Sequence, residues 1–296
     1  MTGVNHSIYY LINQAPKDNQ MTLSVDVIIP TWNSAKWLER VLQAVEEGAH
    51  PARIIIVDRD SVDGTQEIAR AHGCTIILDT ISLGSARTKG IRASNTDWIL
   101  FVDDDVIIPP DFIERMEEFM DKATGALWSP CVSTKEPLRS TNISQHQRAF
   151  GEQGYYLIKP GERGFTNATL IRRELIRDLD ISDLTTWEDW AIAQRVMESG
   201  MHWKVVRVFS DHIHDDKGLF YKTSWNTAGI LNLGRTGRKT VRWALSAYAQ
   251  HLRLYAMSAF REAALDRDAH WCYFYLVQLS GALYAPRHLI GTRKRR

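Results

Sequence analysis

The chain has 296 residues, of which 44% are hydrophobic and 24% are charged, and this ordinary globular composition excludes a disordered, collagen-like or rod-shaped coiled-coil protein. Its 36 basic and 35 acidic residues nearly cancel, but residues 217–296 contain 14 basic and only three acidic side chains. Residues 1–216 are therefore acidic, as expected of a cation site, and the remainder is basic, as expected of a surface that meets phosphate or anionic lipid.

The cysteines and the N-terminal region bear on the cellular compartment in which the protein is located. Cys74, Cys131 and Cys272 are widely spaced and form neither a CxxC pair nor a zinc-binding pattern, so we expect free thiols in a reducing environment. Residues 1–24 form a mostly polar extension that lacks the basic region and apolar run of a signal peptide. These features predict a cytoplasmic protein.

Short β-branched runs alternate with segments of helical periodicity in the first third of the chain. Strands are predicted at 25–29, 54–57, 75–78 and 98–102, and the helices between them begin after Ser34, after Gly64 and at Ser85. This alternation implies right-handed crossovers, and therefore an α/β fold with a mostly parallel, Rossmann-like sheet and helices on both faces.

The rest of the chain has a less regular pattern. It is predicted to contain a helix from 110 to about 122, a strand at 126–132, a long polar loop at 133–154, a strand at 165–171, a helix at 188–199, a strand at 203–208 and two or three helices within 219–290. We therefore expect an α/β domain at 25–216 and a basic, aromatic, helical C-terminal region at 217–296.

Polar residues follow the predicted strands at the point where each one ends. Thr31 and Asn33 follow the first strand, Asp58 the second, Arg87 the third, and residues 103–105 the fourth. Because the carboxyl ends of parallel strands meet at one edge, where ligands bind, we expect these residues to surround a single cleft.

Three adjacent carboxylates, Asp103, Asp104 and Asp105, are the sharpest local signal. A divalent cation with hard oxygen ligands would relieve their mutual repulsion, and Mg²⁺ or Mn²⁺ needs few protein ligands when it is shared with substrate phosphates. The alternative is a solvated acidic turn that caps the helix after Pro110. Because Arg87 is expected at the same edge, we favour the metal site.

Two common phosphate-binding motifs are absent. There is no GxGxxG after the first strand and no GxxxxGK[ST] in the chain, which argues against a Rossmann dehydrogenase and a P-loop NTPase. Metal and side chains would therefore have to hold any phosphate-bearing ligand.

Six segments, in order, carry a resemblance to a known family. They are residues 27–33, 56–65, 84–91, 101–105, 164–173 and 187–190. Together they resemble the motifs of the inverting glycosyltransferases of family 2, which have the GT-A fold, and the resemblance covers roughly residues 25–215.

The resemblance implies a role for each matching residue. The nucleotide-sugar donor would be bound by Pro30, Thr31, Asn33, Asp58, Arg87, Asp103 and Asp104. Asp103 and Asp105 would be the ends of the D-x-D signature, one directed to the ribose and the other to the Mn²⁺ or Mg²⁺ that bridges the diphosphate. Asp189 would be the general base, and Glu188 would orient Asp189 or the acceptor. Taken alone, Glu188 and Asp189 are better explained as charges that stabilise a helix N-terminus, and the other motifs shift the interpretation of Asp189 to catalysis.

Two histidines follow the last predicted strand. His212 and His214 are alternate residues of an extended segment, so their side chains could reach one ion. The alternative is a pair of structural or surface histidines. We favour His212 as the metal ligand because it is closer to the strand end.

Attack of an acceptor hydroxyl on the anomeric carbon needs one carboxylate to remove a proton and one metal to stabilise the departing diphosphate. The leading hypothesis is therefore a metal-dependent glycosyltransferase that moves a sugar from a nucleotide donor, most simply a UDP-sugar, to a glycan or lipid-linked acceptor of the cell envelope, with inversion. The alternatives are a sugar-nucleotide pyrophosphorylase and a catalytically silent binding relative. The sequence does not decide whether the protein forms a homo-oligomer.

Residues 269–286 contain no Asp, Glu, Lys or Arg and are rich in tyrosine. This stretch is short and polar for a spanning helix, and it suits an interfacial helix whose aromatic rings lie at headgroup depth. The alternatives are a helix packed in the core or against a second subunit, and a true span. The region 219–296 is thus a candidate for peripheral membrane contact, whereas no recognition fold supports nucleic-acid binding.

Overall fold

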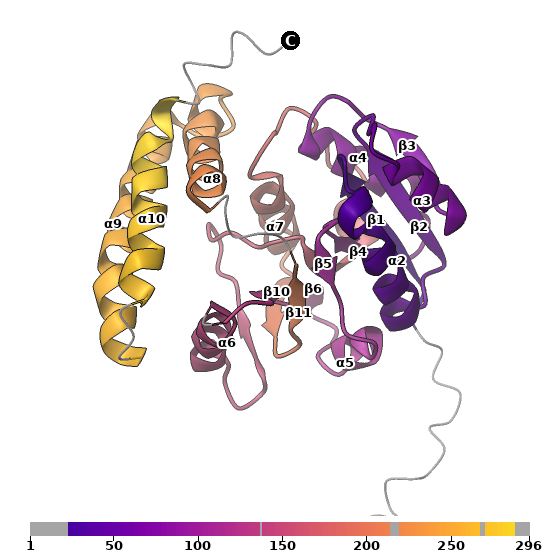
Figure 1. Ribbon diagram of the computed structural model, residues 1–296, viewed down its shortest axis with the longest axis horizontal. Helices are drawn as coiled ribbons and strands as arrows, with labels where there is room; N and C mark the ends of the chain where they lie inside the picture. The colour runs from indigo at the N-terminus through magenta and orange to yellow at the C-terminus, as the bar shows by residue number, and fades with distance from the viewer. Residues whose placement is uncertain (1–22, 137, 214–218, 267–269, 288–296) are drawn as a thin grey trace, which may run out of the picture.

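A sheet of eight strands lies at the centre of the computed structural model, which describes residues 23–136, 138–213, 219–266 and 270–287 (Figure 1). In sheet order the strands are β3 (Thr75–Leu78), β2 (Arg53–Asp58), β1 (Val25–Thr31), β4 (Trp98–Val102), β9 (Ala168–Arg172), β6 (Thr124–Trp128), β10 (His202–Val206) and β8 (Tyr155–Leu157). The first four are parallel, β9 is antiparallel to both of its neighbours, and β8 is antiparallel to β10. The predicted mostly parallel α/β sheet is confirmed.

A second, small sheet lies beside the carboxyl edge of the main one. It consists of β5 (Val106–Ile107), β11 (Ser210–His212) and β7 (Cys131–Ser133), in that order. β11 pairs antiparallel with β5, so that His212 lies opposite Val106. This pairing brings the end of the chain's α/β part next to the acidic triplet.

Helices cover both faces of the main sheet. Alternate side chains of each strand point to opposite faces, so each face has its own hydrophobic core. The helices are α2 (Ala35–Ala49), α3 (Thr65–Ala71), α4 (Leu83–Ala93), α5 (Phe112–Glu117), α6 (Leu138–Ala149) and α7 (Glu188–Glu198). Val27 and Ile29 of β1 pack with Leu38 of α2, whereas Ile28 faces the core that α4 and α7 cover. The β-branched run is buried on both sides, as expected of a parallel strand.

Several predicted boundaries are wrong. The helix expected to reach residue 122 ends at Glu117, and the strand expected at 126–132 is interrupted by Pro130 and continues as β7. The polar segment expected to be a loop contains α6, whose apolar residues are too few to show a helical period. Its His146 instead packs its ring among Trp128, Phe150 and Tyr156.

α2 begins directly after Ser34, as predicted, whereas the start of α4 differs from expectation. Ser34 stands at the N-cap of α2, but its side chain makes no capping bond; its hydroxyl donates to Asp104. α4 begins at Leu83 rather than at Ser85, because the Ser82 hydroxyl accepts a hydrogen bond of 3.0 Å from the Ser85 N–H and so caps the first turn.

The C-terminal region forms three helices, α8 (Leu219–Arg235), α9 (Val241–Asp266) and α10 (His270–Tyr284). Figure 1 shows α9 and α10 on the far side of α8 from the main sheet. The predicted interfacial helix corresponds to α10, and it packs on its neighbours: a side chain at Gly281 would meet the Phe220 carbonyl oxygen at 2.5 Å, and the Tyr248 hydroxyl donates to the Ala282 carbonyl.

No helix in the described part of the chain combines the length and the apolar character needed to cross a membrane. His214 and the terminal residues 288–296 lie outside the described residues, as do most of the N-terminal extension and the side chains of Trp271, Tyr273 and Phe274.

Candidate active site

A cavity of about 440 Å³ opens at the carboxyl edge of the sheet. Its wall includes five of the predicted site residues, which are Arg87, Asp103, Glu188, Asp189 and His212. It also includes Arg163, which directly precedes the predicted segment 164–173. α4, the turn after β4, the start of α7 and the end of β11 each supply part of this wall. The structure therefore gathers at one place groups that are far apart in the sequence.

Arg87 is the buried cation of the cavity. Its Nη2 donates to Asp103 at 3.0 Å, its Nε lies 3.3 Å from Glu188, and its guanidinium group lies over the Phe101 ring. Nη1 is buried without a hydrogen-bond partner among the described residues. A buried guanidinium nitrogen with no acceptor is costly, so this nitrogen is suited to an anionic ligand.

The position of Arg87 depends on a close approach between α4 and the loop before α7. A Cβ atom at Gly84 would lie 2.0 Å from the Ile181 carbonyl oxygen, so only glycine fits there, and the Gly84 N–H donates to the Leu184 carbonyl at 2.9 Å. This contact explains the glycine that opens the third motif. It sets the distance between Arg87 and the acids of α7.

Asp189 is held by Arg163. The Nε of Arg163 donates to both carboxylate oxygens of Asp189, at 2.9 and 3.0 Å, and its Nη2 lies 2.8 Å from Oδ2. The backbone N–H of Trp190 adds a bond of 2.7 Å to Oδ1. Asp189 is thus almost fully buried and fixed in orientation, with the cavity as its open side.

Glu188 points to a different partner, Arg87, so the two adjacent acids at the start of α7 are divided between two arginines. Burial and the neighbouring Asp189 carboxylate raise the pKa of Glu188 to about 7. The residue before them, Trp187, has a left-handed backbone (φ 65°), which is unusual for a bulky side chain and is typical of strained functional turns.

The carboxylates of the acidic triplet face three different groups. Asp103 meets Arg87, and Asp104 accepts a hydrogen bond from Ser34; burial and the neighbouring Asp105 charge raise the pKa of Asp104 to about 7. Asp105 lies 3.2 Å from Nε2 of His212, across the small sheet. Of the predicted metal residues, the structure therefore brings Asp105 and His212 together.

The Asp105–His212 pair fits Mn²⁺ or Mg²⁺ that is shared with a substrate. A carboxylate oxygen and an imidazole nitrogen are both suitable ligands, and such ions keep several positions for water and phosphate. Within the described residues no group of three or more His, Cys, Asp or Glu side chains could hold a metal ion by itself. A substrate oxygen would have to complete the coordination.

Of the predicted nucleotide-sugar residues, Arg87 and Asp103 line the cavity, whereas Pro30, Thr31, Asn33, Asp58 and Asp104 do not. Thr31 and Asp58 are register partners at the ends of β1 and β2, and the Thr31 hydroxyl donates to Asp58 at 2.7 Å. Burial by itself would raise the pKa of Asp58, but hydrogen bonds from Ser61, Thr31 and Gln66 hold it below its ordinary value. Asp58 is therefore a buried carboxylate in its charged form.

The chain turns sharply directly after Thr31. Pro30 is half-buried in β1, and Asn33 has a left-handed backbone (φ 54°) and accepts a hydrogen bond from the Val62 N–H. This turn and the turn after β2 are thereby fixed against each other.

The cavity wall also contains residues that the sequence did not indicate, among them Arg163, Trp225 and Asn226. Trp225 and Asn226 come from α8, which packs on the start of α7: the Trp187 indole donates to the Asn226 carbonyl at 2.7 Å, and a Cβ at Gly229 would meet the Thr186 hydroxyl at 2.0 Å. The basic, aromatic composition of α8 was visible in the sequence, but its contact with α7 was not.

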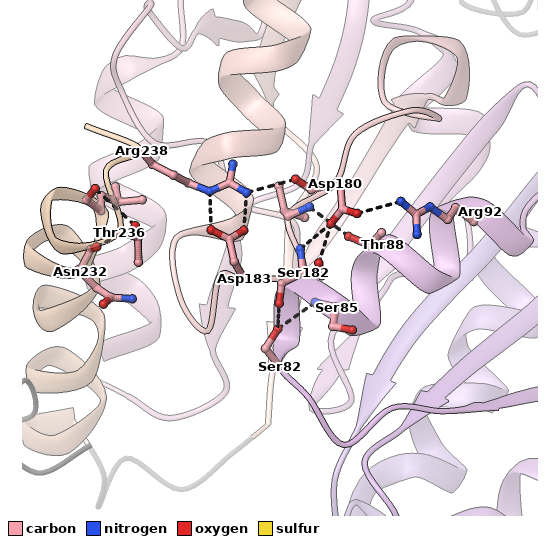
Figure 2. A network of polar contacts seen from close by, with 12 residues as sticks. Ser82, Ser85, Thr88, Arg92, Asp180, Ser182, Asp183, Asn232, Thr236 and Arg238 are labelled. Atoms are coloured by element: carbon pink, nitrogen blue, oxygen red, sulfur yellow. Dashed lines mark hydrogen bonds and ion pairs between the residues drawn. The ribbon is translucent and has the colours of Figure 1, made fainter. Parts of the chain in front are cut away.

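A polar network ties α4, the loop before α7 and the C-terminal helices together (Figure 2). Arg238, in the turn between α8 and α9, donates to the Asp183 carboxylate and to the Asp180 carbonyl, and Arg92 of α4 donates to the Asp180 carboxylate at 2.9 Å. Ser82 adds a bond to the carbonyl of Ser182. The network thereby connects α4 with the C-terminal helices, and α4 and α8 both contribute residues to the cavity wall.

A larger cavity, of about 680 Å³, lies at the opposite, amino end of β1 and β4 and has a different character. Arg172, Arg173 and Arg177 are among its lining residues, and none of the predicted site residues is. The guanidinium group of Arg172 already has protein partners, since it donates to the Thr124 carbonyl and lies over the Trp98 ring.

The sequence matches the family model described as Glycosyl transferase family 2 over residues 26–180, more than half of the chain. The chain belongs to glycosyl transferase family 2. Among curated relatives it is 24% identical over 199 residues to the dolichol-phosphate mannosyltransferase of Pyrococcus furiosus, which covers 63% of this chain and 55% of that protein. The chain spans about half the length of such curated relatives.

Solved structures of other glycosyltransferases share the fold. The mannosyltransferase PcManGT of Pyrobaculum calidifontis, in complex with GDP-Man and Mn²⁺, superposes with a TM-score of 0.62 at 17% identity, over 97% of this chain and 95% of that one. TarS 1-349 of S. aureus, in complex with UDP-GlcNAc, does so with a TM-score of 0.51 at 14% identity, over 91% and 92%. At such identities the likeness shows the fold alone, which is the GT-A fold.

Proposed function

We propose that this family 2 glycosyltransferase transfers a sugar from a nucleoside diphosphate donor to an acceptor hydroxyl with inversion, and that it uses Mn²⁺ or Mg²⁺. One observation carries the proposal. A buried, oriented carboxylate, Asp189, faces a cavity whose wall also contains Arg87, a cation with a spare donor, and His212, which is paired with Asp105.

Asp189 is the general base of the proposed reaction. As the acceptor oxygen forms its bond to the anomeric carbon, the bond from that carbon to the diphosphate oxygen breaks, and the hydroxyl proton passes to the Asp189 carboxylate. Attack from the face opposite the leaving group inverts the anomeric centre. Glu188 is engaged by Arg87, so a single carboxylate faces the acceptor, as a one-step displacement requires.

Arg87 supports the departure of the diphosphate. Its unpartnered Nη1 can donate to a phosphate oxygen, and it stays in place because Asp103 and Glu188 hold the other side of the guanidinium group. Asp105 and His212 would hold the divalent cation, which would stabilise the negative charge of the leaving group as a Lewis acid.

The donor base would lie beside Thr31 and Asp58, since a buried charged carboxylate can accept a hydrogen bond from an imide N–H of uracil. Guanine also has a ring N–H, and the structural relatives are in complex with both kinds of donor, UDP-GlcNAc and GDP-Man. A UDP-sugar is the first choice, in agreement with the sequence hypothesis.

The acceptor would enter on the α8 side of the cavity. Trp225 lines the cavity and is 43% exposed, so its ring offers a flat apolar face, and Asn226 beside it adds polar groups. Such a face suits the apolar side of a sugar ring. We therefore infer a glycan acceptor, either free or lipid-linked, and expect it to belong to the cell envelope.

The two alternative functions fit less well. A sugar-nucleotide pyrophosphorylase needs a glycine-rich phosphate loop after the first strand, whereas here Trp32 and Asn33 form a turn fixed by Ser61 and Val62. A catalytically silent relative would not need an oriented base beside a buried arginine, and here both are present.

The proposal is tested by incubating the protein with a panel of UDP-, GDP- and dTDP-sugars, with Mn²⁺ and with chelator, and measuring released nucleoside diphosphate. We expect release from one donor class, dependent on the metal. Failure of every donor to release nucleoside diphosphate or to bind with metal would contradict the proposal.

A further inference from the structure

Exposed apolar side chains gather on the C-terminal helices. Among the described residues, the α/β part has five exposed large apolar side chains, whereas α8, α9 and α10 together have nine. Five of these nine belong to α9: Val241, Leu245, Leu254, Met257 and Phe260. Isolated exposed apolar residues are ordinary, but a cluster of them marks an interaction surface.

The five side chains lie on the part of α9 that does not pack against the protein. Leu254, Met257 and Phe260 follow one another at spacings of three residues, Val241 and Leu245 are four residues apart, and together the five are spread over about 220° of the helix circumference. The opposite side is the packed one, where Ala244 and Ser258 are buried and Tyr248 bonds to α10. Figure 1 shows α9 at the margin of the bundle, away from the sheet. We call this exposed side the α9 face.

Arginines lie among the apolar residues of the α9 face. Arg242 and Arg253 are exposed, and Arg242 lies between Val241 and Leu245 while Arg253 adjoins Leu254. The sequence of residues 241–261 contains no Asp or Glu. Exposed apolar side chains interspersed with arginines, without acidic residues, suit a helix that lies in a membrane interface, where long cationic side chains can reach the headgroups.

We propose that the α9 face docks the protein on an anionic lipid surface. Leu254, Met257 and Phe260 enter the boundary between headgroups and acyl chains, while the two arginines keep their guanidinium groups at the level of the lipid phosphates. The helix lies on the surface and does not cross it, in agreement with its packed inner side.

Charge complementarity favours this occupant over a second copy of the chain. In a two-fold contact between α9 faces, arginines of one copy would meet arginines of the other without an acidic partner on residues 241–261. Nucleic acid would satisfy the arginines but would leave the five apolar side chains without a partner. An anionic lipid surface satisfies both features.

The helix that makes the proposed contact is α9 and not α10. The sequence pattern indicated residues 269–286, but the described part of α10 is mostly half-buried, and a side chain at Gly281 would clash with the backbone of α8. Five of the nine exposed apolar residues lie on α9, where arginines interrupt the apolar sequence. The docking proposal is independent of the proposed reaction.

Vesicle flotation of the full chain tests the proposal. Phosphatidylcholine vesicles with and without phosphatidylglycerol are compared for the wild type, for Leu254→Gln combined with Phe260→Gln, and for Arg242→Gln combined with Arg253→Gln. We expect flotation with the anionic vesicles. The arginine variant should lose about 30-fold in partition coefficient, since each cation near the surface contributes a factor of about five. The apolar variant should lose at least about tenfold.

Leu78→Gln is the matched control, because Leu78 is 54% exposed, as Leu254 is 53% exposed, but lies on edge strand β3. It should float as the wild type does. Unchanged flotation of both α9 variants, with unfolding temperatures like that of the wild type, would overturn the proposal. So would a change in oligomeric state without any change in flotation, which would assign the face to self-association.

Discussion

Arg163 donates hydrogen bonds to both carboxylate oxygens of Asp189, although 26 residues separate the two in the chain. The guanidinium group of Arg163 also lies over the Trp187 and Phe165 rings, which keep it in place. Asp189 thus has a fixed orientation, because one guanidinium group binds both of its carboxylate oxygens. Arg163 is therefore a positioning residue for the proposed general base.

Replacing Arg163 should affect the chemical step and spare the donor. Arg163→Gln removes the two-point contact, and we expect kcat to fall by about 10- to 100-fold because the carboxylate loses its orientation. The KM for the donor should change little, since Arg87 and the Asp105–His212 pair are untouched. Arg163→Lys should recover part of kcat. Steady-state kinetics at varied donor and acceptor concentrations measure both, and an unchanged kcat in Arg163→Gln would remove its positioning role.

His212 should be needed for metal-dependent binding. His212→Ala leaves Asp105 as the single protein ligand of the pair, so we expect the affinity for UDP in the presence of Mn²⁺ to fall by at least about tenfold and the affinity with chelator to stay the same. Calorimetry with each variant measures this. His202→Ala, an exposed histidine at the start of β10, is the control. Equal Mn²⁺ enhancement in His212→Ala and wild type would exclude the assignment.

Trp225 should matter for the acceptor alone. If its ring is the platform for an acceptor sugar, Trp225→Ala should raise the acceptor KM by about tenfold and leave the donor KM unchanged. Tyr221→Ala is the matched control, because Tyr221 lies one turn earlier on α8, is exposed, and does not line the cavity. A rise in the donor KM, or equal effects of the two variants, would argue against an acceptor subsite at Trp225.

Glu188 should make stability depend on pH. Burial and the charge of Asp189 raise the pKa of Glu188 from 4.5 to about 7, so between these values the folded chain binds more protons than the unfolded chain. The free energy of unfolding contributed by this group is therefore highest below about pH 4.5 and falls as the pH rises to about 7. Glu188→Gln should abolish that fall and be more stable than the wild type at neutral pH.

Urea unfolding at a series of pH values measures this dependence. Glu198→Gln, at the exposed end of α7, is the control and should behave as the wild type does. A Glu188→Gln variant that is less stable than the wild type at neutral pH would show that the ion pair with Arg87 outweighs the cost of burying the carboxylate.

The main sheet could be predicted because its strands are short apolar runs buried on both faces, such as 25–29 and 98–102. The cleft residues followed, since the carboxyl ends of parallel strands must meet at one edge. α6 was not predicted because it lacks an apolar stripe. The helix packs instead through His146, whose ring lies in an aromatic cluster.

Contacts between distant segments account for the rest. The Asp105–His212 pair depends on the short strands β5 and β11, of two and three residues, which have no period to detect. The Arg163–Asp189 contact joins the loop before β9 to the start of α7, and the place of Trp225 in the cavity depends on how α8 meets α7 at Gly229. No local pattern specifies either contact.

The proposed reaction depends above all on removal of the acceptor hydroxyl proton by Asp189. Asp189→Asn keeps the size of the side chain but removes the base, so transfer should fall by about a thousandfold or more while binding of the donor with Mn²⁺ stays within about twofold of the wild type. Transfer is measured as glycosylated acceptor and binding by calorimetry on the same preparations. We expect loss of transfer with retained donor binding, and retained transfer by Asp189→Asn would rule out Asp189 as the general base.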